Sequence, residues 1–150
     1  MIATVSREIA NIVAGLVRPA FVQTAALCTR DGPSGVEVLM IRTLTRKLWV
    51  IPKGWPMKGK TLAEAAAQEA WEEAGVRGRL EPDPIGAFTY TKIKKTGLPV
   101  QCRAQVFRLH TTEVADVYPE CTIRTRVWLS PAKAAARASI PELKALLQRL

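Results

Sequence analysis

Short apolar segments alternate with turn and loop sequences along most of the chain. Residues 36–42 and 100–109 alternate apolar and polar positions, as strands with one buried face do. Turn-forming residues at 31–35 and 94–98 separate neighbouring segments and predict tight turns. The pattern predicts strands at 23–29, 36–42, 48–51, 85–92, 100–109 and 124–129, with loops at 44–47, 52–60 and 111–122.

One longer helix is predicted between these strands. Thr61 and Glu64 match a capping box, in which each side chain accepts a hydrogen bond from the other residue's backbone N–H. An alanine-rich stretch then favours helix propagation, and Gly75 supplies a left-handed residue that ends the helix. Shorter helices are predicted to begin at Pro131 and Pro141. This order of strands, helix, strands and helices predicts an α+β fold with a mixed sheet.

The first 20 residues differ from the rest of the chain. Their apolar run is interrupted by Glu8 and Asn11 and lacks a clear small-residue cleavage site, so we expect a short helix or flexible arm instead of a secretory signal. Residues 21–150 suit a single domain with its own core. No apolar run is long enough to span a bilayer, and we expect a cytoplasmic protein without a membrane partner.

The chain is strongly basic. Its formal charge is +9, from 22 Lys and Arg against 13 Asp and Glu, and the basic residues are spread through the sequence. This balance favours an anionic partner, which could be nucleic acid, a membrane surface or a polyphosphorylated small molecule. With one histidine and three widely spaced cysteines, the composition does not indicate a zinc site or a disulfide framework.

Three carboxylates lie close together on the predicted longer helix. At about 100° per residue, Glu73 lies about 40° from Glu69 and Glu72 about 60° to the other side, so all three project from one sector. Each like-charge pair costs roughly 0.2–0.5 kcal/mol, and the macrodipole disfavours acids near a helix C-terminus. A solvated acidic face is one explanation. Bound Mg²⁺ or Mn²⁺ is the other, because clustered carboxylates without nitrogen or sulfur partners suit a hard cation.

Residues 54–76 resemble the signature motif of the Nudix hydrolase family, G-x5-E-x7-R-E-U-x-E-E-x-G-U, where U is a bulky aliphatic residue. The chain matches this pattern at Gly54, Glu69, Glu72, Glu73, Gly75 and Val76. Lys60 stands where the family has glutamate, Gln68 stands where it has arginine, and Ala70 is small for its position. In the family that arginine helps to hold the loop and the helix together, so the two replacements predict reduced turnover.

The resemblance implies a Nudix α/β/α sandwich in which the carboxylate-bearing helix follows a glycine loop. It also implies Mg²⁺-dependent hydrolysis of an X-diphosphate linkage. Glu69, Glu73 and the backbone carbonyl of Gly54 would bind the metal ion, and Glu72 would bind metal or act as the general base. These roles make residues 54–73 the candidate catalytic site.

The substrate is less sharply indicated. The sequence WVIPKGWPMKGK and the segment 124–128 are most similar to the branch of the family that acts on diadenosine and diphosphoinositol polyphosphates. Another nucleoside diphosphate linkage, and a weakly active or inactive module that binds an anionic ligand or RNA, stay open, as does the choice between monomer and homodimer. Nucleic acid is the weaker candidate partner, because no DNA-binding motif is present. The candidates for phosphate contacts are Arg46, Lys53, Lys92, Lys94, Arg103 and Arg124.

Overall fold

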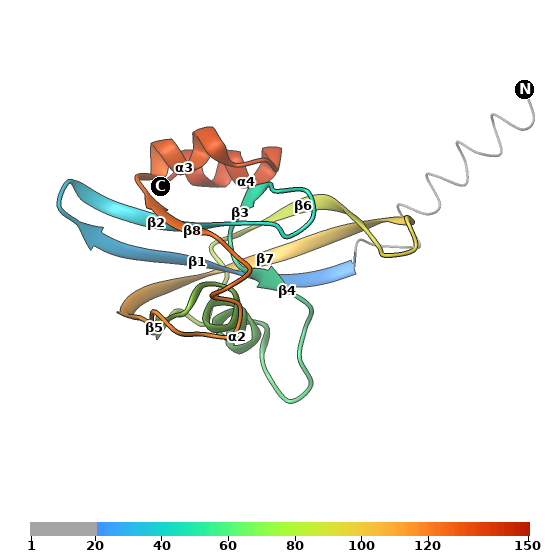
Figure 1. Cartoon of the computed structure of the whole chain (residues 1–150), viewed down its shortest axis with the longest axis horizontal. Helices are drawn as coiled ribbons and strands as arrows, with labels where there is room; N and C mark the ends of the chain where they lie inside the picture. Colours follow the sequence, from blue (N-terminus) through green and yellow to red (C-terminus); the bar gives the residue numbers. More distant parts are fainter. Residues whose placement is uncertain (1–20) are drawn as a thin grey trace, which may run out of the picture.

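The computed structural model, which describes residues 21–150, has a mixed eight-stranded sheet covered by helices on both sides (Figure 1). Helix α2 lies below the sheet in this view, and α3 and α4 lie together above it. The predicted α+β sandwich is therefore confirmed, whereas the prediction for residues 1–20 lies outside the described residues. The strands are β1 (Phe21–Gly32), β2 (Gly35–Arg42), β3 (Trp49–Val50), β4 (Lys53–Gly54), β5 (Val76–Leu80), β6 (Gly86–Ile93), β7 (Pro99–Val114) and β8 (Arg126–Leu129), and the helices are α2 (Leu62–Ala74), α3 (Pro131–Arg137) and α4 (Pro141–Gln148).

Strands β1 and β7 form the centre of the sheet and pair in parallel, with Phe21 opposite Cys102 and Thr29 opposite His110. The other ladders are antiparallel. On the edge of β1 that does not face β7, the first half of the strand pairs with β4 and the second half pairs with β2. Strand β4 therefore lies beside the middle of the central pair, directly before the loop that leads into α2.

Helix α2 begins and ends where the sequence predicts. The side chains of Thr61 and Glu64 form the reciprocal capping box, and Gly75 adopts the left-handed conformation with a φ of 67°. The helix turns a row of alanines toward the sheet, including Ala66 and Ala70, which are fully buried. Small side chains at these positions allow the helix backbone to lie close to the strands, so Ala70 suits this packing. The carboxylates of Glu69 and Glu73 project from the sector next to these alanines, toward strand β4.

The structure differs from the sequence prediction in three elements. Strand β5, Val76–Leu80, was not expected, because its sequence VRGRL places exposed arginines in the strand and gives no clear apolar alternation. Strand β4 lies inside the predicted loop 52–60 and contains only two residues. Strand β7 continues to Val114, into the predicted acidic loop 111–122, because pairing with β5 stabilises this polar extension.

No helix in residues 21–150 combines the length and apolar character that a membrane crossing requires. The buried core instead lies between the sheet and the helices on both sides, and includes Leu27, Ile41, Phe88, Leu143 and Leu147.

Candidate active site

The carboxylates of α2 lie against the short strand β4. A Cβ atom at position 54 would overlap the carboxylate of Glu69, so this side chain occupies space that only a glycine leaves free. The neighbouring residue, Lys53, donates its backbone N–H to Glu73 Oε1 at 3.0 Å. The structure thus brings Gly54, Glu69 and Glu73 together at the junction between the glycine loop and the helix.

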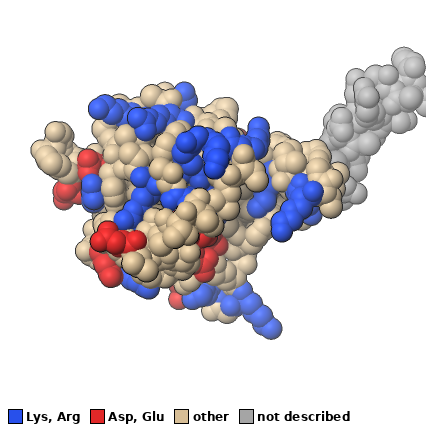
Figure 2. Space-filling model, viewed as in Figure 1, with Lys and Arg blue, Asp and Glu red and all other residues tan. Residues whose placement is uncertain are grey.

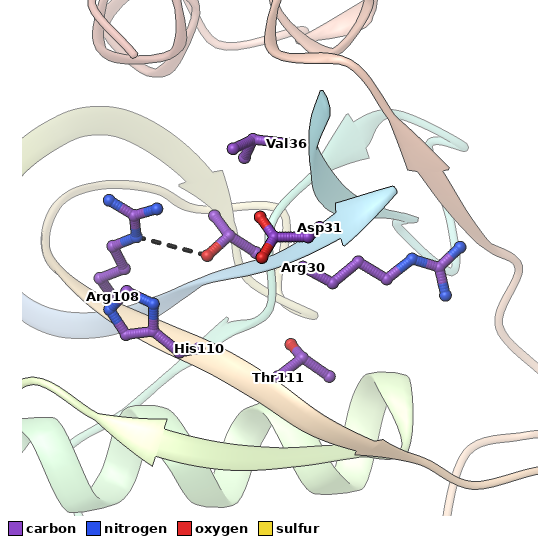
Figure 3. Close-up of a pocket in the computed structure, with 7 residues that line it drawn as sticks. Arg30, Asp31, Val36, Arg108, His110 and Thr111 are labelled. Carbon is purple, nitrogen blue, oxygen red and sulfur yellow. Dashed lines mark hydrogen bonds between the residues drawn. The ribbon is translucent and has the colours of Figure 1, made fainter. Parts of the chain in front are cut away.

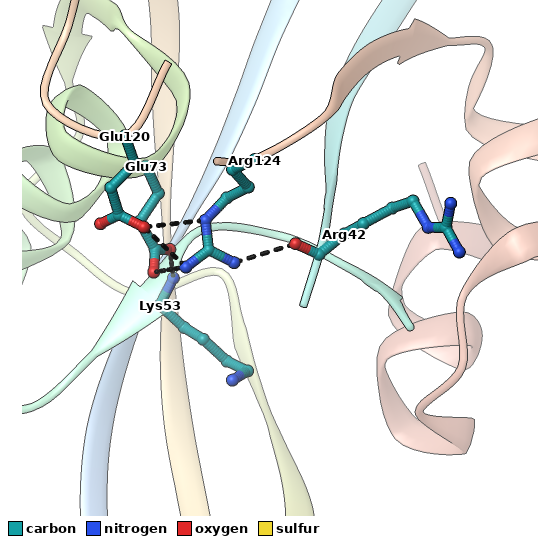
Figure 4. A network of polar contacts seen from close by, with 5 residues as sticks. All are labelled: Arg42, Lys53, Glu73, Glu120 and Arg124. Carbon is teal, nitrogen blue, oxygen red and sulfur yellow. Dashed lines mark hydrogen bonds and ion pairs between the residues drawn. The ribbon is translucent and has the colours of Figure 1, made fainter. Parts of the chain in front are cut away.

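Arg124 holds Glu73 from the other side (Figure 4). Its Nη2 lies 3.3 Å from Glu73 Oε2 and 2.8 Å from Glu120 Oε1, and its Nη1 donates to the backbone carbonyl of Arg42 at 2.9 Å. The Nε atom also donates to Glu120, at 3.0 Å. Only 9% of the Arg124 side chain and 12% of the Glu73 side chain are exposed. Arg124 is therefore a buried partner of the acids, and the phosphate contact predicted for it stays a prediction.

Glu120 is a fourth carboxylate of this site that the sequence analysis did not identify. It lies in the connection between β7 and β8, and its backbone N–H donates to the carbonyl of Glu72 at 3.0 Å. Arg126 strengthens the same junction by donating to the carbonyl of Ala74 at 2.7 Å. The acid was missed because this long-range contact has no local sequence pattern. The arginine four residues later, at an i,i+4 spacing, is the signal that could have suggested it.

Glu72 has a different environment from the other two acids of α2. Gln68 Nε2 donates to Glu72 Oε1 at 2.8 Å, one helical turn away. The side chain at the family's arginine position therefore makes a neutral hydrogen bond within the helix. The loop before α2 is closed by its own backbone instead, since the N–H of Lys60 donates to the carbonyl of Met57 at 3.1 Å and Thr61 begins the capping box.

Burial raises the pKa values of two carboxyl groups in the site. Burial is the largest cause that raises the pKa of Glu69 to about 8, and the charges of Glu73, Glu72 and Glu120 raise it further while Arg124 opposes them. Burial also raises the pKa of Glu73, against the opposing charge of Arg124 and the hydrogen bond from Lys53. At neutral pH the metal-free site therefore carries carboxyl groups that favour protonation or a bound cation.

These pKa shifts predict that the metal-free protein loses stability as the pH rises. A carboxyl group such as Glu69, whose pKa is raised from 4.5 to about 8 by folding, binds more protons in the folded than in the unfolded state between those values. Stability should therefore fall by about 1–3 kcal/mol from pH 5 to pH 8, discounted for the partial exposure of Glu69. Thermal unfolding in EDTA at several pH values measures this, and Glu69→Gln should flatten the profile. Stability that rises over this range would contradict the described burial.

The donor atoms suit a hard divalent cation. Within residues 21–150, no three acidic, histidine or cysteine side chains already converge as a complete metal cage. The available donors are nevertheless all oxygens, and the carboxylates of Glu69 and Glu73 flank β4 with raised pKa values. Mg²⁺ is commonly bound by only one or two carboxylates and keeps several waters, so a complete protein cage is not required. The residues fit such an ion by donor type and charge.

The predicted phosphate-binding residues divide into groups. Lys53, Lys92 and Lys94 lie on one face of the sheet, with their ammonium groups beside aromatic rings. Arg103 projects from the other face, because it follows Cys102 in β7 and pairs with Thr89 and not with Tyr90. Arg46 lies in the exposed turn between β2 and β3, and no hydrogen bond or ion pair among residues 21–150 links it to the acids. The structure thus places three lysines together and separates both arginines from them.

A small pocket of about 110 Å³ lies at the other end of the central strand pair (Figure 3). Its basic side chains already have partners: Arg108 donates to Thr29 Oγ1 at 3.3 Å, Arg30 pairs with Glu37, and His110 bonds Glu81. His110 therefore has a structural partner away from the acids of α2. This pocket is separate from the candidate active site.

Comparison with known proteins finds a matching domain family and relatives within it. The NUDIX domain model matches residues 21–150. Nudix hydrolase 13, mitochondrial, from Arabidopsis thaliana is 34% identical over 110 residues, which cover 69% of this chain and 54% of that protein. Nudix hydrolase 16, mitochondrial, from the same organism is 31% identical over 140 residues, covering 89% of this chain and 76% of the relative. The chain spans about half the length of the first of these relatives.

Solved structures share the fold at low sequence identity. A binary complex of Caenorhabditis elegans Ap4A hydrolase superposes with a TM-score of 0.64 at 20% identity, covering 87% of this chain and 94% of the other. The MutT protein from Methanosarcina mazei superposes with a TM-score of 0.64 at 24% identity, covering 87% and 92%. At this identity the likeness concerns the arrangement of the strands and helices.

Proposed function

The chain belongs to the Nudix family, and from this premise we propose that it hydrolyses a phosphoanhydride bond with the help of a divalent cation. The candidate substrates are a nucleoside diphosphate linked to a second group, a diadenosine polyphosphate and a diphosphoinositol polyphosphate. The observation that carries this proposal is the placement of Glu69 and Glu73 against β4, where Gly54 leaves room for one carboxylate and the backbone of Lys53 binds the other. A solvated acidic face would not bury its acids in this way.

Mg²⁺ is the proposed ion, with Mn²⁺ as a substitute, and Glu69, Glu73, Glu72 and the carbonyl of Gly54 are its proposed ligands. When bound, the ion would polarise a phosphoryl oxygen and neutralise charge on the leaving group. Arg124 is a positioning residue, because its guanidinium holds Glu73 and Glu120 without reaching outward. This neutralises part of the negative charge that the acids carry before an ion binds.

Glu72 is the proposed general base. Gln68 holds Glu72 Oε1, and no hydrogen bond among residues 21–150 occupies the second oxygen, which can accept a proton from water. The water oxygen forms the new P–O bond, the bridging P–O bond breaks, and the released proton passes to the carboxylate. Lys53 on β4 and Lys92 on β6 have their ammonium groups beside Tyr90 and Trp55, and they would bind the phosphates that are not attacked.

The second candidate function is a weakly active or inactive Nudix module that binds an anionic ligand or RNA. The observation in its favour is the neutral hydrogen bond of Gln68, which stays within α2 and leaves the family's charged link between loop and helix unmade. Ligand binding without metal and without turnover would support this function. The cytoplasmic location and the monomeric or dimeric state stay predictions, and the mitochondrial location in the relatives' names is a property of those proteins.

Turnover by a Glu72→Gln variant tests the proposed function. Phosphate release with Mg²⁺ is measured on ADP-ribose, Ap4A and a diphosphoinositol polyphosphate, with the wild-type protein and the variant side by side. Loss of the base predicts a fall in kcat of about 100- to 10,000-fold on whichever substrate is turned over. Glu113→Gln, an exposed acid on β7, is the matched control and should keep wild-type activity. Equal turnover by wild type and Glu72→Gln would refute the mechanism.

A further inference from the structure

Aromatic and lysine side chains share one face of the sheet, at the end where β1 begins and where β4 and β6 end. This face is opposite α2, since Thr24 Oγ1 donates to the carbonyl of Leu62 in α2 while the preceding residue, Gln23, bonds the hydroxyl of Tyr90 in β6. Alternation along β1, β4 and β6 places Phe21, Lys53 and Lys92 on the Gln23 side, and contacts with Lys92 and Phe21 bring Trp55 and Lys94 to the same set. We call this set the lysine–aromatic ledge, and it consists of Phe21, Trp55, Tyr90, Lys53, Lys92 and Lys94.

The outer part of the ledge is an exposed aromatic pair. Phe21 and Trp55 meet edge to face with their ring centroids 6.1 Å apart, and they are 53% and 41% exposed. Lys92 Nζ lies 5.2 Å from the Trp55 ring, and Lys94 Nζ lies 5.7 Å from the Phe21 ring. An aromatic pair left in water beside ammonium groups is a surface that can stack a flat ring and bind a nearby anion.

The inner part of the ledge leads to the acids. Trp55 directly follows Gly54, whose backbone faces Glu69, and the backbone N–H of Lys53 donates to Glu73. The ammonium group of Lys53 points the other way and lies 4.4 Å from the ring of Tyr90 on the ledge. The two-residue strand β4 therefore has the acids on one side and the ledge on the other. A phosphate chain that crosses β4 would reach both.

The charge of this end of the molecule matches such a ligand. Figure 2 shows basic side chains over the end where the β6–β7 hairpin lies, and this hairpin carries Lys92, Lys94 and Lys95. An inositol polyphosphate offers phosphates to these lysines but no flat aromatic ring to Trp55. A nucleotide offers both, so the exposed rings distinguish the two substrate classes.

We propose that Trp55 and Phe21 stack the base of a nucleotide whose phosphates pass Lys92 and Lys53 toward the acids of α2. The inference rests on the proposed function for the direction of the phosphate chain, and it assigns the substrate class as a nucleotide polyphosphate. Trp55 is then a specificity-determining residue. Single-stranded RNA is the competing occupant of an aromatic and basic surface, and the test below separates it.

Binding of two probes with the same number of phosphates tests the stacking. The affinities of ATP and of inorganic tripolyphosphate are measured with Mg²⁺ by calorimetric titration, in a Glu72→Gln background that limits hydrolysis. The background protein should bind ATP about 5- to 150-fold more tightly than tripolyphosphate, the range that one stacked base supplies. Trp55→Leu and Phe21→Leu should reduce this preference and leave the affinity for tripolyphosphate unchanged.

Two further variants separate the ring from the charge. Lys92→Met should weaken both probes by the same factor, because it removes a phosphate contact and leaves the rings. Ile93→Ala is the matched control: Ile93 is 49% exposed, and alternation along β6 turns it to the other face, so both affinities should stay as in the background protein. Melting temperatures of all variants confirm that the fold is kept.

The binding measurements have results that would overturn the proposed stacking. Equal affinity for ATP and tripolyphosphate, or an ATP preference that survives both Trp55→Leu and Phe21→Leu, would overturn it. A single-stranded RNA oligonucleotide that binds more tightly than ATP would overturn it in favour of RNA. Turnover on the substrate panel is scored separately. An ATP preference without turnover contradicts only the proposed function, and turnover without an ATP preference contradicts only this inference.

Discussion

Replacing Glu69 with glutamine is expected to lower Mg²⁺-supported kcat/KM by at least about 100-fold and at the same time to stabilise the metal-free protein. The two effects have one cause. The carboxylate of Glu69 packs on Gly54 near Glu73, where burial raises its pKa to about 8. A neutral amide of the same size removes this unfavourable charge, and it also removes a proposed ligand of the cation.

The opposite signs make the Glu69→Gln prediction specific. At pH 8 in EDTA, the melting temperature should rise by about 2–4 °C, which corresponds to roughly 1 kcal/mol for a domain of this size. Phosphate release is measured with Mg²⁺ on the same preparation, and Glu113→Gln, whose carboxylate is exposed, should change neither quantity. A variant that loses both stability and activity would mean that Glu69 supports the fold and not a metal ion.

Replacing Arg124 with methionine is expected to destabilise the protein by about 3–5 kcal/mol at pH 8. Arg124 is 9% exposed, and its guanidinium bonds Glu73, Glu120 and the carbonyl of Arg42. Methionine fills much of the space but leaves two neighbouring carboxylates without their shared cation. The loss should be smaller at pH 5, where the raised pKa of Glu73 allows its carboxyl group to be protonated.

Denaturant unfolding at pH 5 and pH 8 measures this effect, with Arg103→Met as the control because Arg103 is exposed. Adding Glu73→Gln to Arg124→Met should recover part of the lost stability, since the double variant no longer buries that unpaired charge. A loss below about 1 kcal/mol, equal at both pH values, would show that the Arg124 ion pairs behave as exposed ones do.

The parts of the fold that local chemistry determines were predicted from the sequence. The capping box at Thr61, the left-handed stop at Gly75 and the shared sector of Glu69, Glu72 and Glu73 all depend on residues within one or two helical turns. The strands with apolar alternation were likewise found, although their ends moved by a few residues. For such segments the alternation of apolar and polar residues in the sequence is enough to predict a strand.

The missed features depend on contacts between distant parts of the chain. Strand β5 is held mainly by its pairing with β7, and its exposed arginines hide it from an apolar pattern. Glu120 reaches α2 through the connection after β7, and burial of Arg124 follows from the convergence of that connection with β2 and β4. A basic residue near a phosphate-type motif resembles a substrate contact in the sequence, and only tertiary structure shows that acids already surround it.

Titration of Mg²⁺ into metal-free protein tests the central claim most directly. Phosphate release and the melting temperature are followed together at pH 7.5, for the wild-type protein and for Glu69→Gln, with the substrate that the panel identifies. Wild-type activity should be absent in excess EDTA, and the midpoint of its rise should fall near the Mg²⁺ concentration at which the melting temperature begins to increase. The Glu69→Gln variant should need at least about tenfold more Mg²⁺ for both. Full activity in EDTA, or the same midpoint in both proteins, would contradict a metal site built on the carboxylates of α2.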